Sequence, residues 1–156
     1  MLPYPVGKSY VTGLTACSAS FHAPGQPDQF AIDFDMSIGE EITASFSGTV
    51  VFVEESGGDF GFPNNKVIVQ TGNIFVQYMH LTQNGAEVNI GDAIQTGDLI
   101  GYSGATGTAG YPHLHFVVTQ GESFEYPYQS VPVTFRNTTA NPNSLISGET
   151  YEALPY

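Results

Sequence analysis

Basic residues are scarce in this chain. Its 156 residues include three lysines and arginines against fifteen acidic residues, which gives a net charge of −12. Binding to a nucleic-acid backbone or to an anionic membrane surface depends on clustered lysine and arginine. Neither is therefore expected as a partner, and the simplest interpretation of the acidity is solubility.

Long apolar runs and tryptophan are missing as well. Trp is absent, although there are 9 tyrosines and 11 phenylalanines. No apolar stretch approaches the ~20 residues that are needed to cross a membrane, so a membrane-spanning segment is not expected.

There is one cysteine, Cys17, so an intramolecular disulfide is impossible. Cys17 ends the run "LTAC", which looks like the cleavage box of a bacterial lipoprotein. The preceding residues lack the basic start and the apolar stretch of ~7–15 residues that a signal peptide needs. We therefore expect a plain cysteine that is buried or half-buried, and we expect any export signal to lie outside this sequence.

Helix signals are few, because the apolar residues show no sustained spacing of three and four. What the chain has instead is short β-branched and aromatic runs, separated by 18 scattered glycines and 10 prolines. This pattern is typical of strands and turns. We expect one all-β domain over residues 1–156, a twisted antiparallel sheet or flattened barrel, with its core at about 20–136 and an irregular tail at 137–156.

Alternating apolar residues predict strands at 30–36, 48–55, 114–120 and 131–136, and a hairpin over 65–81 that turns at "TGN". Pro132 places the strand at 131–136 on an edge, since proline has no N–H to donate. Residues 88–112 contain regularly recurring glycines, which predict turns and very short strands. They lack the Gly-Lys-Ser/Thr ending of a phosphate loop.

Two of the four histidines stand one residue apart in "YPHLHF", residues 111–116. Side chains alternate along a strand, so His113 and His115 point to one side and Leu114 points to the core. Two imidazoles in this arrangement can bind one metal ion, or one can bind it while the other transfers protons. The alternative is a pair of histidines on a polar, solvent-facing surface.

The remaining histidines and one aspartate favour the metal. His80 ends a predicted strand, and His22 lies in a loop that leads to a strand carrying Asp33. Asp33 stands between Ile32 and Phe34, and a carboxylate in such an apolar strand needs a partner. Zinc commonly takes three protein ligands and leaves a fourth position to water, so two histidines and an aspartate would suffice, and two histidines would remain for proton transfer.

A series of motifs resembles the lysostaphin-type (LytM) zinc endopeptidases of bacterial cell walls. In family order, over residues 20–120, the chain reads "FHAPGQPDQFAIDF", "SGTVVFV", "YMHL", "VNIGDAIQTGDLIG", "SGATG" and "PHLHF". The resemblance implies a Zn²⁺ cofactor, peptidoglycan peptides as the substrate, and a secreted, periplasmic or cell-envelope location.

Site residues follow from the same resemblance. His22, Asp33 and His115 are the implied zinc ligands, and His80 and His113 the implied catalytic pair. In the shorter family pattern the first histidine lies four residues before the aspartate, where this chain has Gln29. A branch with a longer loop, ending in Tyr/Phe-Ala-Ile/Leu-Asp-Phe, matches "FAIDF" better.

Several points stay open at this level. Tyr78 and Tyr111 flank the implied histidines, and we expect them either to line the cleft and contact substrate or to pack on the sheet. The glycine-rich residues 101–110 form either a wall of the cleft or plain turns. Either catalytic histidine could be the general base. A non-catalytic domain that binds the wall or regulates another hydrolase, and a peptidase acting on a different extracellular protein, are the alternative functions. The sequence says nothing about oligomeric state.

Overall fold

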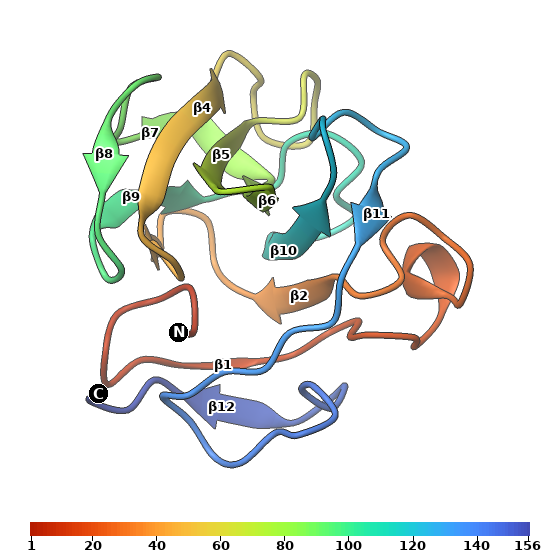
Figure 1. Cartoon of the computed structure of the whole chain (residues 1–156). Helices are drawn as coiled ribbons and strands as arrows, with labels where there is room; N and C mark the ends of the chain where they lie inside the picture. Colours follow the sequence, from red (N-terminus) through yellow and green to blue (C-terminus); the bar gives the residue numbers. More distant parts are fainter.

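The chain is described over residues 1–156 by a computed structural model, and its largest element is a seven-stranded antiparallel sheet (Figure 1). The spatial order is β11-β10-β6-β5-β4-β8, and β2 also pairs with β10. The strands are β2 (Ile32–Asp35), β4 (Gly48–Glu54), β5 (Lys66–Thr71), β6 (Ile74–Met79), β8 (Ala93–Ile94), β10 (His113–Gln120) and β11 (Gln129–Ser130).

Two smaller sheets complete the architecture. One has three strands in the order β3-β9-β7, and the other pairs β1 with β12. Their bounds are β3 (Glu41–Thr43), β9 (Leu99–Ser103), β7 (Leu81–Ala86), β1 (Ser9–Val11) and β12 (Thr150–Glu152). The only helical element is the 3-10 turn η1 (Ser20–His22). The all-β antiparallel class is therefore confirmed, and the strand order is open, so the sheets form no closed barrel.

Strand alternation divides the main sheet into two faces. The predicted hairpin is β5–β6, joined by Gly72 and Asn73, with Gly72 at φ +61°. One face carries the hydrophobic core, to which β5, β6 and β10 contribute Val67, Val69, Val76, Tyr78, Leu114, Phe116 and Val118. Side chains at the intervening positions point to the opposite face, where the cavity described below lies.

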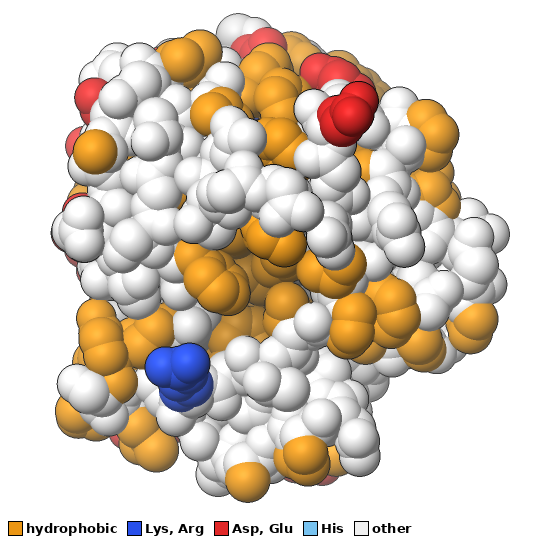
Figure 2. All heavy atoms as spheres, viewed as in Figure 1, with side chains coloured by type: hydrophobic (Ala, Val, Ile, Leu, Met, Phe, Trp, Pro, Cys, Tyr) orange, Lys and Arg blue, Asp and Glu red, His pale blue; other side chains and the backbone are white.

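The outer surface has few charges on the face drawn in Figure 2. Hydrophobic and uncharged groups dominate there, basic side chains show at one place, and no histidine is visible. The histidines are hidden because all four are at most 8% exposed. No helix is long and apolar enough to cross a membrane.

Residues 131–136, the last of the predicted strands, do not form a strand in the structure. Residues 131–136 run alongside the sheet, and the Val131 N–H donates to the Val118 carbonyl, but they form no ladder. Further along, the Asn141 side chain takes the place of a partner strand: its Oδ1 accepts from the Phe135 N–H at 2.7 Å and its Nδ2 donates to the Phe135 carbonyl at 2.9 Å. The N–H and carbonyl of Phe135 are therefore satisfied without a neighbouring strand.

The C-terminal segment 137–156 was expected to be irregular, and that expectation is wrong for part of it. β12 pairs with β1 near the other end of the chain, and the side chains of Leu145, Tyr151 and Ala153 belong to the core. Cys17 also differs from expectation, since it is exposed rather than buried.

Candidate metal and catalytic site

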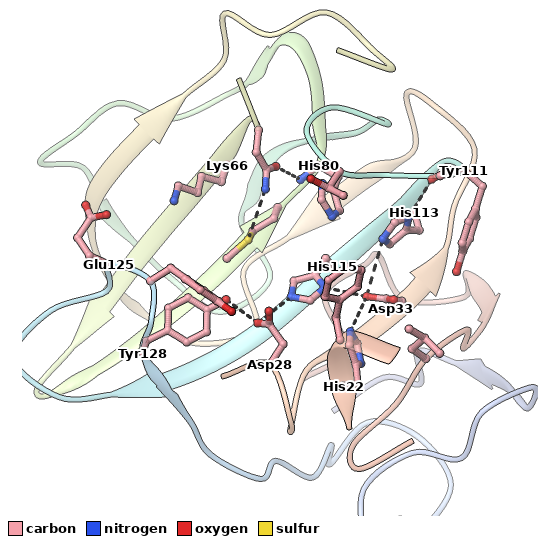
Figure 3. A pocket seen from close by; sticks show the side chains of 17 residues that line it. His22, Asp28, Asp33, Lys66, His80, Tyr111, His113, His115, Glu125 and Tyr128 are labelled. Carbon is pink, nitrogen blue, oxygen red and sulfur yellow. Dashed lines mark hydrogen bonds and ion pairs between the residues drawn. The ribbon is translucent and has the colours of Figure 1, made fainter. Parts of the chain in front are cut away.

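A cavity of about 550 Å³ lies over the face of the main sheet opposite the core. All four histidines and Asp33 line it, although they come from positions up to 93 residues apart (115 − 22). Aromatic side chains line it too, namely Phe21, Tyr111, Tyr126 and Tyr128. Figure 3 shows the imidazoles of His22, His113 and His115 around Asp33, with His80 farther from it.

The sheet ladder sets the position of the first two candidate ligands. His115 on β10 lies directly opposite Asp33 on β2, and on its other side it lies opposite Met79 on β6. Directly opposed residues in an antiparallel pair point to the same face. His113 shares that face because it is two residues from His115, while Leu114 lies in the core, as the sequence predicted.

His22 arrives from a separate loop. It closes the turn η1 and is 1% exposed. The loop is closed on itself by backbone bonds from the Cys17 N–H to the Gln29 carbonyl at 2.7 Å and from the Ala31 N–H to the Asp28 carbonyl at 2.9 Å. These bonds constrain the loop that carries His22, whose Nε2 lies 3.5 Å from Asp33 Oδ1 on β2.

The spacing of these three side chains fits a zinc ion. Asp33 Oδ1 lies 3.5 Å from His22 Nε2 and 2.9 Å from His115 Nδ1, and the ligand atoms of the three residues are all within 4.8 Å of one another. Tetrahedral zinc with bonds of ~2.0–2.1 Å separates its ligand atoms by about 3.3 Å. The two measured distances bracket that value, so His22, Asp33 and His115 can hold the ion.

A second group, His80, His113 and His115, also satisfies the 4.8 Å limit. It shares His115 with the first group but contains no carboxylate. Asp33 Oδ1 lies farther from His113 Nε2, at 3.8 Å, than from His115 or His22. The group with the carboxylate therefore offers zinc the better charge balance.

The protonation states of these groups complement one another in the absence of metal. Burial lowers the pKa of His22 below its ordinary value, so this imidazole is neutral and has a lone pair to offer. Burial also acts to lower the pKa of His115, but hydrogen bonds and charges from Asp28 and Asp33 outweigh it and raise that pKa to about 10. Burial acts to raise the pKa of Asp33, yet the bond and charge of His115 bring it below its usual range. His115 and Asp33 therefore form a buried ion pair without metal.

His80 and His113 share a different arrangement. The Nδ1 of His80 lies 2.6 Å from the Thr106 carbonyl, and the Nδ1 of His113 lies 2.8 Å from the Tyr111 carbonyl. A carbonyl can only accept, so each Nδ1 must carry a hydrogen, and Nε2 is the nitrogen of each ring that can take up or give a proton. The two rings are 4.7 Å apart. Burial and the neighbouring imidazoles lower the pKa of His80 to about 3, which keeps it neutral.

His80 reaches the cavity through an unusual backbone conformation. It follows the last residue of β6 and has φ +67°, in the left-handed region. Its N–H donates to Asn64 Oδ1 at 3.1 Å. A non-glycine residue in this region is uncommon and costs free energy, so the surrounding contacts must hold it there.

The glycine-rich stretch supplies some of those contacts. A Cβ on Gly104 would lie 2.3 Å from the backbone nitrogen of Thr82, and one on Gly107, which has φ +71°, would lie 2.6 Å from Asn64 Cβ. This close packing places Thr106, whose carbonyl orients His80. Both interpretations of the stretch are therefore partly right, because residues farther along it, including Thr108 and Gly110, line the cavity.

The two tyrosines singled out from the sequence lie in different places. Tyr111 lines the cavity, and its ring stacks on His113 with centroids 4.7 Å apart. Tyr78 is fully buried in the hydrophobic core, where its Oη accepts from the Ser45 N–H. Tyr78 therefore does not line the cleft but packs on the sheet, the other possibility left open by the sequence, because it follows the strand alternation to the core face while His80 leaves it.

Sequence reasoning missed two residues behind the site. Asp28 Oδ1 lies 3.3 Å from His115 Nε2, the nitrogen that faces away from Asp33. The Tyr128 hydroxyl donates to the same oxygen of Asp28. Asp28 falls within the run "FHAPGQPDQFAIDF", but no feature of that run distinguishes it from the other loop residues, and Tyr128 comes from a loop without a motif. A carboxylate in this position orients a ligand histidine.

The comparisons with known proteins point in one direction. Residues 28–127 match the model of peptidase family M23. This segment contains Asp33, His80, His113 and His115, and it begins after His22.

Two curated relatives are similar to this chain in sequence. Lysostaphin of Staphylococcus simulans is 36% identical over 88 residues, which make up 56% of this chain and 17% of lysostaphin. The peptidoglycan DD-endopeptidase ShyA of Vibrio cholerae is 31% identical over 103 residues, 65% of this chain and 23% of ShyA. The chain thus corresponds to about a fifth of the length of these relatives.

Among solved structures, the catalytic domain of lysostaphin from Staphylococcus simulans superposes with a TM-score of 0.58. It is 29% identical, and the match covers 78% of this chain and 88% of that domain.

Proposed function

Because this chain belongs to peptidase family M23, a family of zinc-dependent peptidases, we propose that it is a zinc endopeptidase that hydrolyses peptide bonds of peptidoglycan, in stem peptides or cross-bridges. One observation carries the proposal: a three-residue ligand set of zinc spacing lies beside two imidazoles whose Nδ1 atoms are bonded to backbone carbonyls, so that Nε2 is the nitrogen left for proton transfer. The names of the relatives, lysostaphin and a peptidoglycan DD-endopeptidase, support the substrate. An enzyme with this substrate works in the cell envelope or outside the cell.

His22, Asp33 and His115 would hold the metal, which supplies Lewis acidity toward the scissile carbonyl and lowers the pKa of bound water. The Nε2 of His80 or His113 accepts the proton of the attacking water. The other imidazole can donate a hydrogen bond to the oxyanion that develops on the carbonyl oxygen only as the imidazolium, because its Nδ1–H already bonds a backbone carbonyl and its Nε2 must carry a second hydrogen. The proton then passes to the leaving amine. Both Nδ1–H groups stay on backbone carbonyls throughout, so the rings keep their orientation.

The test combines metal analysis with product identification. Purified protein should contain about one zinc per chain, as a single three-ligand site implies, and mass spectrometry should find peptide fragments released from purified peptidoglycans of differing cross-bridge. Replacing His115 with alanine should abolish both zinc and hydrolysis. Replacing His113 with alanine should leave zinc in place and slow hydrolysis by roughly 10²–10⁴-fold, the usual contribution of a general acid or base.

Two outcomes would contradict the proposal. Full-rate hydrolysis by His113→Ala would remove His113 from the chemistry. A wild-type protein that binds peptidoglycan but releases no fragment, with zinc bound, would favour the wall-binding or regulatory alternative.

A further inference from the structure

Lys66 is the only one of the three basic residues that lines the cavity. Lys8 is exposed elsewhere and pairs with Glu40 at 3.4 Å. Lys66 has no carboxylate at ion-pair distance, and its Nζ lies 5.2 Å from the centre of the Phe52 ring. Glu54 on β4 lies directly opposite Lys66, but the two side chains form no ion pair, so the Lys66 ammonium can still bind an anionic group in the cavity of a chain with a net charge of −12.

The sheet ladder places Lys66 relative to the candidate zinc ligands. Lys66 on β5 lies directly opposite Met79 on β6, and Met79 lies directly opposite His115 on β10. The three side chains therefore share the cavity face. Two strand spacings of ~4.8 Å put the Lys66 backbone about 10 Å from that of His115. An extended peptide covers that distance with about three residues.

We propose that Lys66 forms a subsite for a free carboxylate of the peptide substrate, borne within about three residues of the cleaved bond; the inference rests on the proposed endopeptidase function. The substrate class is then an anionic peptide, and an uncharged one such as oligoglycine is disfavoured. The side chain of Met79 lies between Lys66 and His115 and gives the substrate an apolar floor to cross. The ammonium supplies local attraction that the acidic surface as a whole does not.

Glu125 is the group that limits this subsite. It lines the same cavity from an exposed position, and Figure 3 shows it on the same side as Lys66, away from Tyr111. Its carboxylate repels a bound substrate carboxylate and competes for the ammonium. Removing the charge of Glu125 should therefore strengthen the preference for an anionic substrate, whereas removing the charge of Lys66 should abolish it.

The experiment uses two cross-linked muropeptides that differ only in their stem carboxylates, which are free in one and amidated in the other. The zinc-loaded wild type should hydrolyse the free-acid form with a kcat/KM roughly tenfold higher, the size of one partly desolvated ion pair. Lys66→Gln should hydrolyse both forms at similar rates, and Glu125→Gln should widen the difference. Lys8→Gln makes the same change in net charge outside the cavity and should keep the wild-type preference.

Equal hydrolysis of the two forms by the wild type would overturn the carboxylate subsite and leave the proposed function standing. A preference that survives in Lys66→Gln would overturn the role of Lys66. If the zinc-loaded wild type hydrolyses neither form, nor intact peptidoglycan, the proposed function fails. Binding of the two muropeptides to zinc-loaded His113→Ala, measured by calorimetry, then still decides the subsite: tighter binding of the free acid supports it and equal binding refutes it.

Discussion

Replacing Tyr78 with phenylalanine tests the stability of the core without touching the cavity. One face of β6 packs in the core and the other faces the cavity, and Tyr78 lies on the core face. The ring of Tyr78 packs against Phe116, with centroids 5.5 Å apart, and this contact survives the change. Only the hydroxyl is lost, and with it the partner of the Ser45 N–H at 2.8 Å. Ser45 is 2% exposed, so water does not replace that partner.

An unpaired buried amide costs about 1–3 kcal/mol. For a domain of this size each kcal/mol lowers Tm by roughly 2–4 °C. Urea denaturation should show the loss of stability, while kcat/KM per folded molecule should stay at the wild-type value. Tyr4→Phe is a matched control, since Tyr4 is another buried core tyrosine, and its hydroxyl donates to the Tyr151 carbonyl at 2.8 Å. A Tyr78→Phe protein of unchanged stability and reduced kcat/KM would refute the assignment of Tyr78 to the core.

Two further predictions concern the metal. Asp28→Asn should weaken zinc binding roughly 10–100-fold, the usual effect of losing a group that orients a ligand histidine. Competition with a chelating dye measures this affinity. An unchanged affinity would show that the bond from Asp28 to His115 does not contribute to zinc binding. Zinc affinity should rise about tenfold per pH unit between pH 6 and 8, because the pKa of His115 is raised to about 10 without metal and zinc must displace that proton. Calorimetric titrations in buffers of different ionisation enthalpy should find one proton released per zinc, and a pH-independent affinity would contradict the ion pair.

The sequence predicted those parts of the fold that depend on local pattern. The β5–β6 hairpin, the strand that became β10 and the placement of Leu114 in the core follow from alternation and turn residues. The resemblance to the lysostaphin-type zinc endopeptidases is confirmed at the level of the family. The structure also brings the five implied site residues into one cavity, although their individual roles stay predictions.

Features that depend on distant contacts escaped prediction. β1 and β12 lie at opposite ends of the sequence, and each is only three residues long, too short for a pattern. The alternation at 131–136 is real, but the Asn141 side chain takes the place of a partner strand at Phe135. At His80 the left-handed backbone breaks the alternation that would otherwise have put His80 and Tyr78 on the same face.

The two-faced character of β10 also bears on how the chain folds. If β10 slipped by one residue against its neighbours, every side chain would change faces. His113 and His115 would then enter the apolar core, and Leu114 and Phe116 would enter the cavity. Burying imidazoles without partners is costly, and β10 is held between β2 on one side and β6 on the other. The histidines that form the site thus act during folding as well, by penalising every odd-numbered shift of the strand that carries them.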